Sequence, residues 1–184
     1  IAAYVGHSKV VKTLIAAGAD VNQARTDEGA TPLYAAADNG HSKVVKTFIA
    51  AGADVNQART DDGVTPLHVA SYNGHSKVVQ MLIAAGADVN QARTDGGATP
   101  LYTAAQVGHS KVVKTLIAAG ADVNQARTNN GATPLYTAAY NGHSQVAKML
   151  IAAGAAVNQA RTDDGATPLY IGAGKGHFEV VQTL

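Results

Sequence analysis

Histidine can act as an acid, a base or a metal ligand near neutral pH, and in this sequence it recurs at a fixed spacing. Six histidines stand 34 residues apart, each directly after a glycine: His7, His41, His75, His109, His143 and His177. Packed helices lie about 8–10 Å apart, so equivalent histidines on neighbouring helices are too distant to share a metal ion. We therefore interpret this column as turn-stabilising residues and predict no metal site.

Other chemically capable residues are repeated in the same way. Serine, histidine and aspartate recur with the period of the sequence, so no single trio stands out as a hydrolase triad. The segment Gly172-Ala173-Gly174-Lys175-Gly176 is weakly similar to a phosphate-binding loop. It lacks the required spacing and a preceding strand, and the matching residues of the other copies fit a helix. We predict no catalytic residue, no cofactor and no enzymatic activity.

Charged side chains form two further columns. The arginines are Arg25, Arg59, Arg93, Arg127 and Arg161, and they are accompanied by the aspartates Asp20, Asp54, Asp88 and Asp122, with Ala156 in the fifth copy. An exposed arginine row could bind an acidic partner. The favoured alternative is a ladder of surface ion pairs, each contributing about 0–1 kcal/mol.

The composition excludes several classes of protein. Lysine plus arginine (14) nearly balances aspartate plus glutamate (13), so the chain lacks the basic excess expected of a nucleic-acid-binding protein. The sequence contains no cysteine, which excludes disulfides and is compatible with a reducing compartment. No apolar run approaches the roughly 18 residues of a membrane span, and no signal peptide is visible. We expect a cytoplasmic, intracellular protein.

A 34-residue period organises the whole chain. Thr-Pro-Leu begins at Thr31, Thr65, Thr99, Thr133 and Thr167. We predict a single array over 1–184, with a partial unit 1–26, full units 27–60, 61–94, 95–128 and 129–162, and a partial unit 163–184. Both ends fall within helical patterns, so we expect a segment of a longer array, and copies could stack end to end through uncapped termini.

Each unit has the pattern of two helices and a loop. Thr31 is a good N-cap, Pro32 suits the first helical position, and Gly40 can end the first helix. The second helix begins near His41-Ser42, carries an apolar stripe and ends at Gly52. The polar stretch 53–63 is predicted to be an extended loop or hairpin.

The core of such a unit is small. Aromatic residues make up only 5% of the chain, and alanine pairs such as Ala36-Ala37 and Ala104-Ala105 allow helices to approach closely. One buried aliphatic side chain contributes about 1.5–3 kcal/mol, so the few in each unit cannot offset the ordering of its backbone. Stacking of neighbouring units is therefore required for stability.

The motifs Thr-Pro-Leu-Tyr-x-Ala-Ala, Gly-His-x-x-Val-Val-x-x-Leu-Ile and Gly-Ala-Asp-Val-Asn resemble those of the ankyrin repeat. The resemblance covers the whole chain and implies an all-α ankyrin-repeat solenoid with protruding hairpin-like loops. Two features depart from the family. The period is 34 and not 33, with the extra residue in 57–60, and tyrosine replaces the family's usual histidine at Tyr34, Tyr102, Tyr136 and Tyr170, while His68 retains it.

The resemblance implies a non-catalytic scaffold that binds a protein partner through a concave surface of first-helix faces and hairpin tips. The matching positions vary between copies and give the candidate residues Glu28, Asp38, Asn39, Asp62, Tyr72, Asn73, Gln106, Val107, Asn130, Tyr140 and Asn141. Tyr72 and Tyr140 are the preferred anchors. Random drift is the alternative source of this variation, because framework positions such as Phe48 and Ser71 vary as well.

Two other functions remain open: a structural spacer or spring, or the regulatory array of a larger enzyme, channel or pathogen effector. The resemblance also implies that the asparagines of the Asp-Val-Asn motif are possible hydroxylation sites. Hydrogen bonding within the hairpins is their expected role.

Overall fold

The computed structural model describes residues 1–184 and contains eleven α-helices and no β-strand. The chain divides into two compact units, Ile1–Asp88 and Val89–Leu184. The predicted all-α class is confirmed.

The first helix of each repeat begins at the proline of Thr-Pro-Leu. In every copy the threonine is the N-cap, and its Oγ1 accepts the N–H of the third helical residue at 3.0–3.3 Å. Proline follows at the first position, where no N–H is needed. These helices are α2 Pro32–Asp38, α4 Pro66–Tyr72, α6 Pro100–Val107, α8 Pro134–Tyr140 and α10 Pro168–Gly174.

The second helix of each repeat begins at the residue after the histidine, as predicted. Gly40 provides the positive φ (+69°) that separates the two helices of one repeat, and Gly52 (φ +81°) ends the second. The second helices are α1 Ser8–Ala16, α3 Ser42–Ala50, α5 Ser76–Ala84, α7 Ser110–Ala118, α9 Ser144–Ala152 and the short α11 Phe178–Val181.

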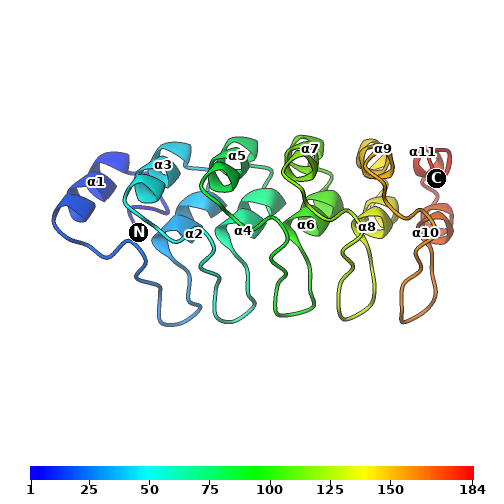
Figure 1. Cartoon of the computed structure of the whole chain (residues 1–184), viewed down its shortest axis with the longest axis horizontal. Helices are drawn as coiled ribbons and strands as arrows, with labels where there is room; N and C mark the ends of the chain where they lie inside the picture. The colour runs from blue at the N-terminus through cyan, green and yellow to red at the C-terminus, as the bar shows by residue number, and fades with distance from the viewer. The chain divides into compact units, whose positions relative to one another are not determined.

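Within each unit the helices form two layers (Figure 1). In the first unit, α1, α3 and α5 form one layer and α2 and α4 the other; in the second unit, α7, α9 and α11 pack against α6, α8 and α10. Each first helix contacts the second helix of its own repeat and the first helix of the next repeat in the unit. The loops project on the side of the first helices (Figure 1).

Aliphatic side chains and alanines fill the space between the layers. The leucine of Thr-Pro-Leu is at most 1% exposed in four copies, Leu33, Leu67, Leu101 and Leu135. Three of the second helices, α3, α5 and α7, bury a valine pair, and the predicted alanine pairs Ala36-Ala37 and Ala104-Ala105 are fully buried. The core is therefore thin and continuous from repeat to repeat within a unit.

The loops contain tight turns. Arg59 N–H donates to the Val64 carbonyl at 3.0 Å, and Gly63 N–H donates to the Arg59 carbonyl at 3.2 Å. Thr60 N–H then donates to the Glu28 carbonyl of the preceding loop at 3.0 Å. This last bond lies in the 57–60 stretch that we expect to hold the extra residue, and it joins neighbouring loops.

The asparagine column forms a ladder of hydrogen bonds between repeats. Asn56 Oδ1 accepts the Asp88 N–H at 2.8 Å, and its Nδ2 donates to the Gly86 carbonyl at 3.2 Å. In the second unit, Asn124 bonds to the Ala156 N–H and the Gly154 carbonyl in the same way. We expected these side chains to bond within their own hairpins; instead they bond to the loop of the next repeat.

Asn124→Ala is expected to destabilise the chain by about 1–2 kcal/mol, because it removes partners from two backbone groups of the next repeat. The measurement is the free energy of unfolding in urea. Asn158→Ala is the matched control, since Asn158 occupies the same column and forms no hydrogen bond in the structure. Equal losses for the two variants would contradict the ladder.

Ser71 is a buried polar exception in the alanine column. Its side chain is fully buried, and its Oγ has no hydrogen-bond partner. Alanine stands at the equivalent positions 37 and 105, where it is also fully buried. The hydroxyl is therefore desolvated without compensation.

Ser71→Ala is expected to stabilise the chain by about 1 kcal/mol, since it removes an unsatisfied buried hydroxyl. The reverse change in the same column, Ala105→Ser, should be destabilising. Thermal denaturation followed by circular dichroism measures both. A lower melting temperature for Ser71→Ala would show that the hydroxyl is satisfied.

Candidate functional site

The candidate face consists of the C-terminal ends of the first helices and the loop tips. Tyr72 is the last residue of α4 and is 54% exposed, and Tyr140 is the last residue of α8 and is 42% exposed. The same column holds Tyr4, which is 58% exposed. Beside Tyr140, the Lys175 ammonium lies 4.4 Å from the centre of the ring. Tyr72 and Tyr140 thus lie at the surface of helices whose other faces are buried, while Tyr4 lies in a turn before α1.

In the first unit, the polar candidates next to Tyr72 bond to one another. Asn73 Nδ2 donates to the carbonyl oxygen of Asp38 at 3.0 Å and to its Oδ1 at 2.9 Å. Asn39 Nδ2 donates to the Ala35 carbonyl one turn earlier. The structure thus brings Asp38, Asn73 and the end of α4 together.

In the second unit, Gln106 and Val107 are exposed at the end of α6. Asn141 follows Tyr140, and its Nδ2 donates to the Thr137 carbonyl at 2.9 Å. Val107 extends α6 by one residue compared with the equivalent helices, so Gly108 and not an asparagine is its C-cap. The two units therefore present different side chains on the same framework.

The candidate side chains at the loop tips form ion pairs or hydrogen bonds with other loop residues. Glu28 Oε2 lies 3.5 Å from Arg59 Nη1, and Asp62 Oδ1 lies 3.5 Å from Arg59 Nε. Asp62 Oδ1 also accepts the Val64 N–H, and Asn130 Oδ1 accepts the Ala132 N–H at 3.1 Å. These side chains shape the loops, which leaves the helix ends as the more available part of the face.

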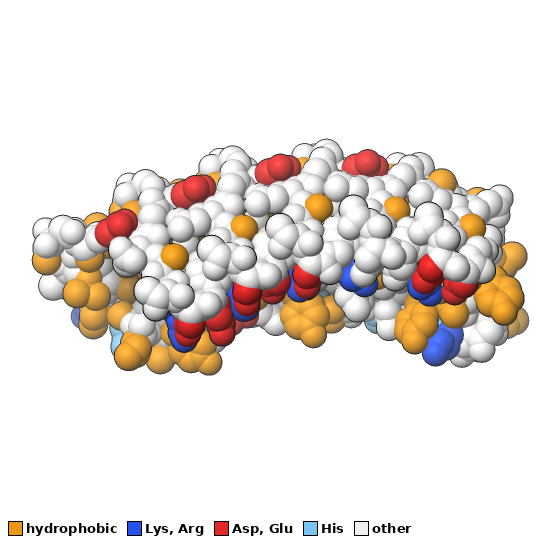
Figure 2. All heavy atoms as spheres, turned by 90° about the horizontal axis from the view of Figure 1, so that it is seen from below, with side chains coloured by type: hydrophobic (Ala, Val, Ile, Leu, Met, Phe, Trp, Pro, Cys, Tyr) orange, Lys and Arg blue, Asp and Glu red, His pale blue; other side chains and the backbone are white.

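The arginine column forms ion pairs, but with aspartates other than those we expected. Each of these arginines pairs with the aspartate two residues later in its own loop: Arg25 with Asp27, Arg59 with Asp61, Arg93 with Asp95 and Arg161 with Asp163. The expected partners Asp20, Asp54 and Asp122 instead accept backbone N–H groups two residues ahead in their own loops. Figure 2, which views the loop side, shows basic and acidic side chains adjacent along the loop ends.

The Arg25–Asp27 and Arg59–Asp61 pairs shift the pKa of both partners. The hydrogen bond from Arg25 lowers the pKa of Asp27 to about 2, and the one from Arg59 lowers the pKa of Asp61. The hydrogen bond with Asp61 correspondingly raises the pKa of Arg59. Because the pKa of Asp27 is lowered, its ion pair with Arg25 stabilises the folded chain at pH values above 3.8, the ordinary pKa of the carboxyl group. This stabilisation is lost as the pH falls through about 2, so the pairs are intact at neutral pH.

Arg127 differs from the other arginines because the aspartate position of its loop is Asn129. Its Nε donates to the Gly96 carbonyl at 3.3 Å, and no acidic side chain pairs with it. Its guanidinium carbon lies 5.6 Å from the centre of the Tyr102 ring.

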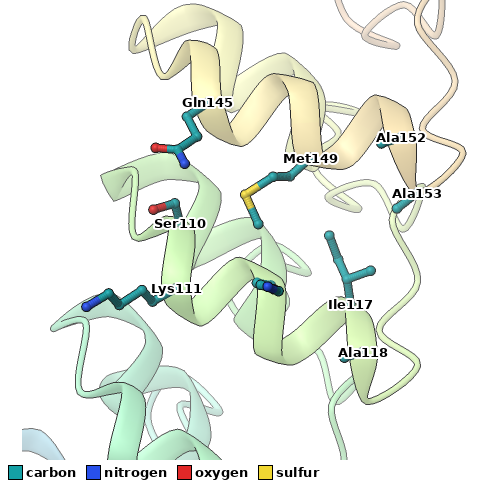
Figure 3. A pocket seen from close by; sticks show the side chains of 9 residues that line it. Ser110, Lys111, Ile117, Ala118, Gln145, Met149, Ala152 and Ala153 are labelled. Atoms are coloured by element: carbon teal, nitrogen blue, oxygen red, sulfur yellow. The ribbon is translucent and has the colours of Figure 1, made fainter.

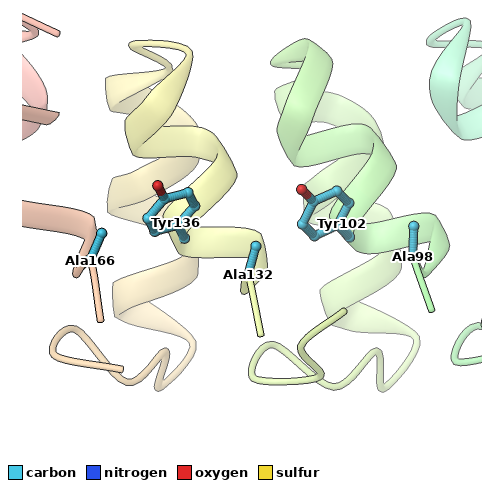
Figure 4. Close-up of a cluster of buried hydrophobic side chains, with 5 residues drawn as sticks. All are labelled: Ala98, Tyr102, Ala132, Tyr136 and Ala166. Atoms are coloured by element: carbon cyan, nitrogen blue, oxygen red, sulfur yellow. The ribbon is translucent and has the colours of Figure 1, made fainter. Parts of the chain in front are cut away.

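The tyrosines that replace the family's histidine also contact this arginine column. The guanidinium carbon of Arg59 lies 5.6 Å from the centre of the Tyr34 ring, and that of Arg161 lies 5.3 Å from the centre of the Tyr136 ring. In both pairs the arginine Nη1 also donates a hydrogen bond to the phenol oxygen. In the second unit, Tyr102 and Tyr136 are buried against the loop alanines Ala98, Ala132 and Ala166 (Figure 4). Each ring thus fixes a loop to its helix, a contact that the sequence analysis missed.

His68 keeps a different arrangement at the same position. Its Nδ1 accepts the Thr65 N–H at 3.2 Å, while Thr65 Oγ1 accepts the His68 N–H at 3.3 Å, which completes a capping box. The one position that retains histidine therefore uses its ring nitrogen to cap the start of α4, which the tyrosines of the other copies cannot do in this way.

The histidine column links neighbouring repeats. Nε2 lies 2.8 Å from the Tyr4 carbonyl in His41 and 3.0 Å from the Asp38 carbonyl in His75. Because a carbonyl only accepts, Nε2 carries the proton. The His75 ring also packs on Gly40, where a Cβ would lie 2.7 Å from Nδ1. This confirms the turn-stabilising role and extends it across the repeat boundary.

The remaining motifs form neither a metal cluster nor a phosphate-binding loop. No group of three or more histidine, cysteine, aspartate or glutamate side chains is positioned to hold a metal ion. The glycines of 172–176 begin within α10, as the comparison of copies predicts, and do not form a phosphate-binding loop after a strand.

Helix pairs that recur every 34 residues, each followed by a projecting loop, define a helical tandem-repeat protein. A family model described as ankyrin repeats, in three copies, matches residues 1–93, 58–127 and 124–184, which together span the chain. The chain belongs to the ankyrin repeat family, whose members are generally protein–protein interaction modules and typically non-catalytic. Comparison with curated proteins found no match. None of the helices is both long enough and apolar enough to cross a membrane.

Proposed function

We propose that the chain is a non-catalytic scaffold that binds a protein partner through the face formed by the first-helix ends and loop tips. The observation that carries this proposal is the exposure of Tyr72 and Tyr140 at equivalent places on two separate helices. Exposed tyrosines have a large contact area and few rotatable bonds, and they are enriched among residues that dominate binding energy. On this proposal, the 34-residue units over 1–184 form one array inside the cell.

The contacts of the candidates suggest how the face is divided. Asn39, Asn73 and Asn141 each donate within the chain, so their side chains are held in place before a partner arrives. Gln106 and Val107 are exposed beside them. A pre-ordered surface loses little side-chain entropy on binding. The differences between copies then determine where along the array the partner binds.

Tyr72→Ala and Tyr140→Ala are expected to leave helicity and the melting temperature nearly unchanged, because both rings are largely exposed. Together they should weaken capture of the partner in a quantitative pull-down with the full chain. Tyr136→Ala is the matched control for folding: its ring is 5% exposed, and its loss should cost about 3 kcal/mol.

Two results would contradict this proposal. Loss of the fold in either exposed-tyrosine variant would place that ring in the core. Unchanged capture by the double variant, with the fold intact, would favour the spacer function or a contact surface elsewhere on the chain.

A further inference from the structure

The lysines are separated from the acidic side chains in this chain. All lysines except Lys175 lie on the second helices: Lys9, Lys12, Lys43, Lys46, Lys77, Lys111, Lys114 and Lys148. The five helices α1, α3, α5, α7 and α9 contain no aspartate or glutamate. Each of these lysines is exposed, and none forms an ion pair. The outer surface of these five helices is therefore basic, whereas α11 carries Glu179 and no lysine, and the whole chain is nearly neutral.

A groove accompanies these lysines between adjacent second helices. In the first unit, a groove of about 500 Å³ between α3 and α5 is lined by Lys43, Lys46, Ile49, Lys77, Met81 and Ala84. A groove of about 590 Å³ between α1 and α3 shares Lys43 and Lys46 and adds Lys12. Both grooves combine aliphatic side chains with several ammonium groups.

The second unit repeats this arrangement independently. A groove of about 630 Å³ between α7 and α9 is lined by Lys111, Lys114, Ile117 and Met149. In Figure 3, Met149 points from α9 toward α7, and Ile117 lies on the α7 side of the same hollow. Lys111 lies on α7 at the edge of the groove, and its side chain extends away from α9 (Figure 3). The feature is thus a property of the repeat and is present in both units.

We propose that these grooves form a second docking surface, which binds acidic peptide segments that also carry apolar side chains. Lysine offers a mobile point charge suited to carboxylates, and the unpaired ammonium groups supply charge complementarity. The floor of Ile49 and Met81 calls for an apolar partner group as well, and methionine adapts to varied shapes. This surface lies on the layer opposite the first helices and is distinct from the face that holds Tyr72 and Tyr140.

The floor distinguishes this occupant from other anions. Nucleic acid binding depends mainly on phosphate contacts and would leave the apolar floor unused. Attachment to an anionic bilayer needs apolar side chains that protrude, whereas Ile49 and Met81 are half-buried between helices. A peptide segment with both acidic and apolar residues can pair with the lysines at the border of the groove and also pack on its apolar floor.

The chain itself provides conservative variants for the test. Gln80 occupies the column of Lys46 on α5, and Gln145 occupies the column of Lys43 on α9. Both glutamines lie in intact helices of the same length as α3. The double variant Lys43→Gln/Lys46→Gln is therefore expected to fold normally while removing the charges shared by two grooves.

The experiment selects a displayed library of random short peptides on the full-length chain and measures the binding of selected peptides by fluorescence anisotropy. The expected result is enrichment of peptides that combine acidic and apolar residues. Lys43→Gln/Lys46→Gln should weaken their binding on the order of tenfold, and raising the salt from about 0.1 M to 1 M should weaken it further.

Three controls make the result decisive. Arg25→Gln/Lys175→Gln removes the same charge away from the second helices and should leave binding unchanged, and Tyr72→Ala should do the same. Met81→Gln should weaken binding, because it removes apolar surface from the floor without changing the charge. The proposal is overturned if selection gives no acidic-apolar peptides, if both charge variants weaken binding equally, or if only an oligonucleotide or anionic vesicle binds the lysines.

Discussion

Packing between neighbouring repeats is the interaction on which the structure depends. The helices of a repeat are only 7–9 residues long over most of the chain, which is too short for stability in isolation. Leu33 and Val45 reach complete burial only where helices of adjacent repeats come together. The asparagine ladder, the histidine–carbonyl bonds and the loop-to-loop bond of Thr60 cross the same boundaries. A repeat therefore gains most of its order from its neighbours.

Because the stabilising contacts lie at the boundaries between repeats, two other surfaces are available for recognition. Residues at the boundary are constrained by small spaces, as the contact between Gly40 and His75 shows. The ends of the first helices and the outer faces of the second helices have no such constraint, so tyrosine, glutamine or valine can alternate on one and lysine or glutamine on the other. The Tyr–Arg contacts connect the framework to the loops and keep the loop tips in register.

Much of the fold followed from repeated local signals. Thr31 and Pro32 start a helix by supplying a cap and removing an N–H, and Gly40 and Gly52 end helices through positive φ, so the helix positions could be predicted from one repeat. The residues that contact the arginines could not be predicted in this way. Every pair of columns in a periodic sequence has a constant spacing, so the 25-residue separation of Tyr34 and Arg59 carried no more information than any other, and the choice of Asp61 over Asp54 depends on the turn geometry.

The site was predictable only in part, for a related reason. Variation between copies identified exposed positions such as Tyr72 and Gln106. It could not show that Glu28 pairs with an arginine of the next loop or that Asn130 accepts a hydrogen bond within its own loop. The second-helix lysines were not predicted as a binding surface, although the sequence places no acidic residue in α1, α3, α5, α7 or α9. The grooves beside them depend on packing between helices and required the structure.

The most direct test of repeat coupling compares the isolated 34-residue peptide 27–60 with the full chain by far-ultraviolet circular dichroism and thermal melting. We predict that the peptide is unfolded in water, while the full chain is helical and melts cooperatively. A peptide that is helical with a cooperative melting transition of its own would show that each repeat is stable without its neighbours and would contradict the account.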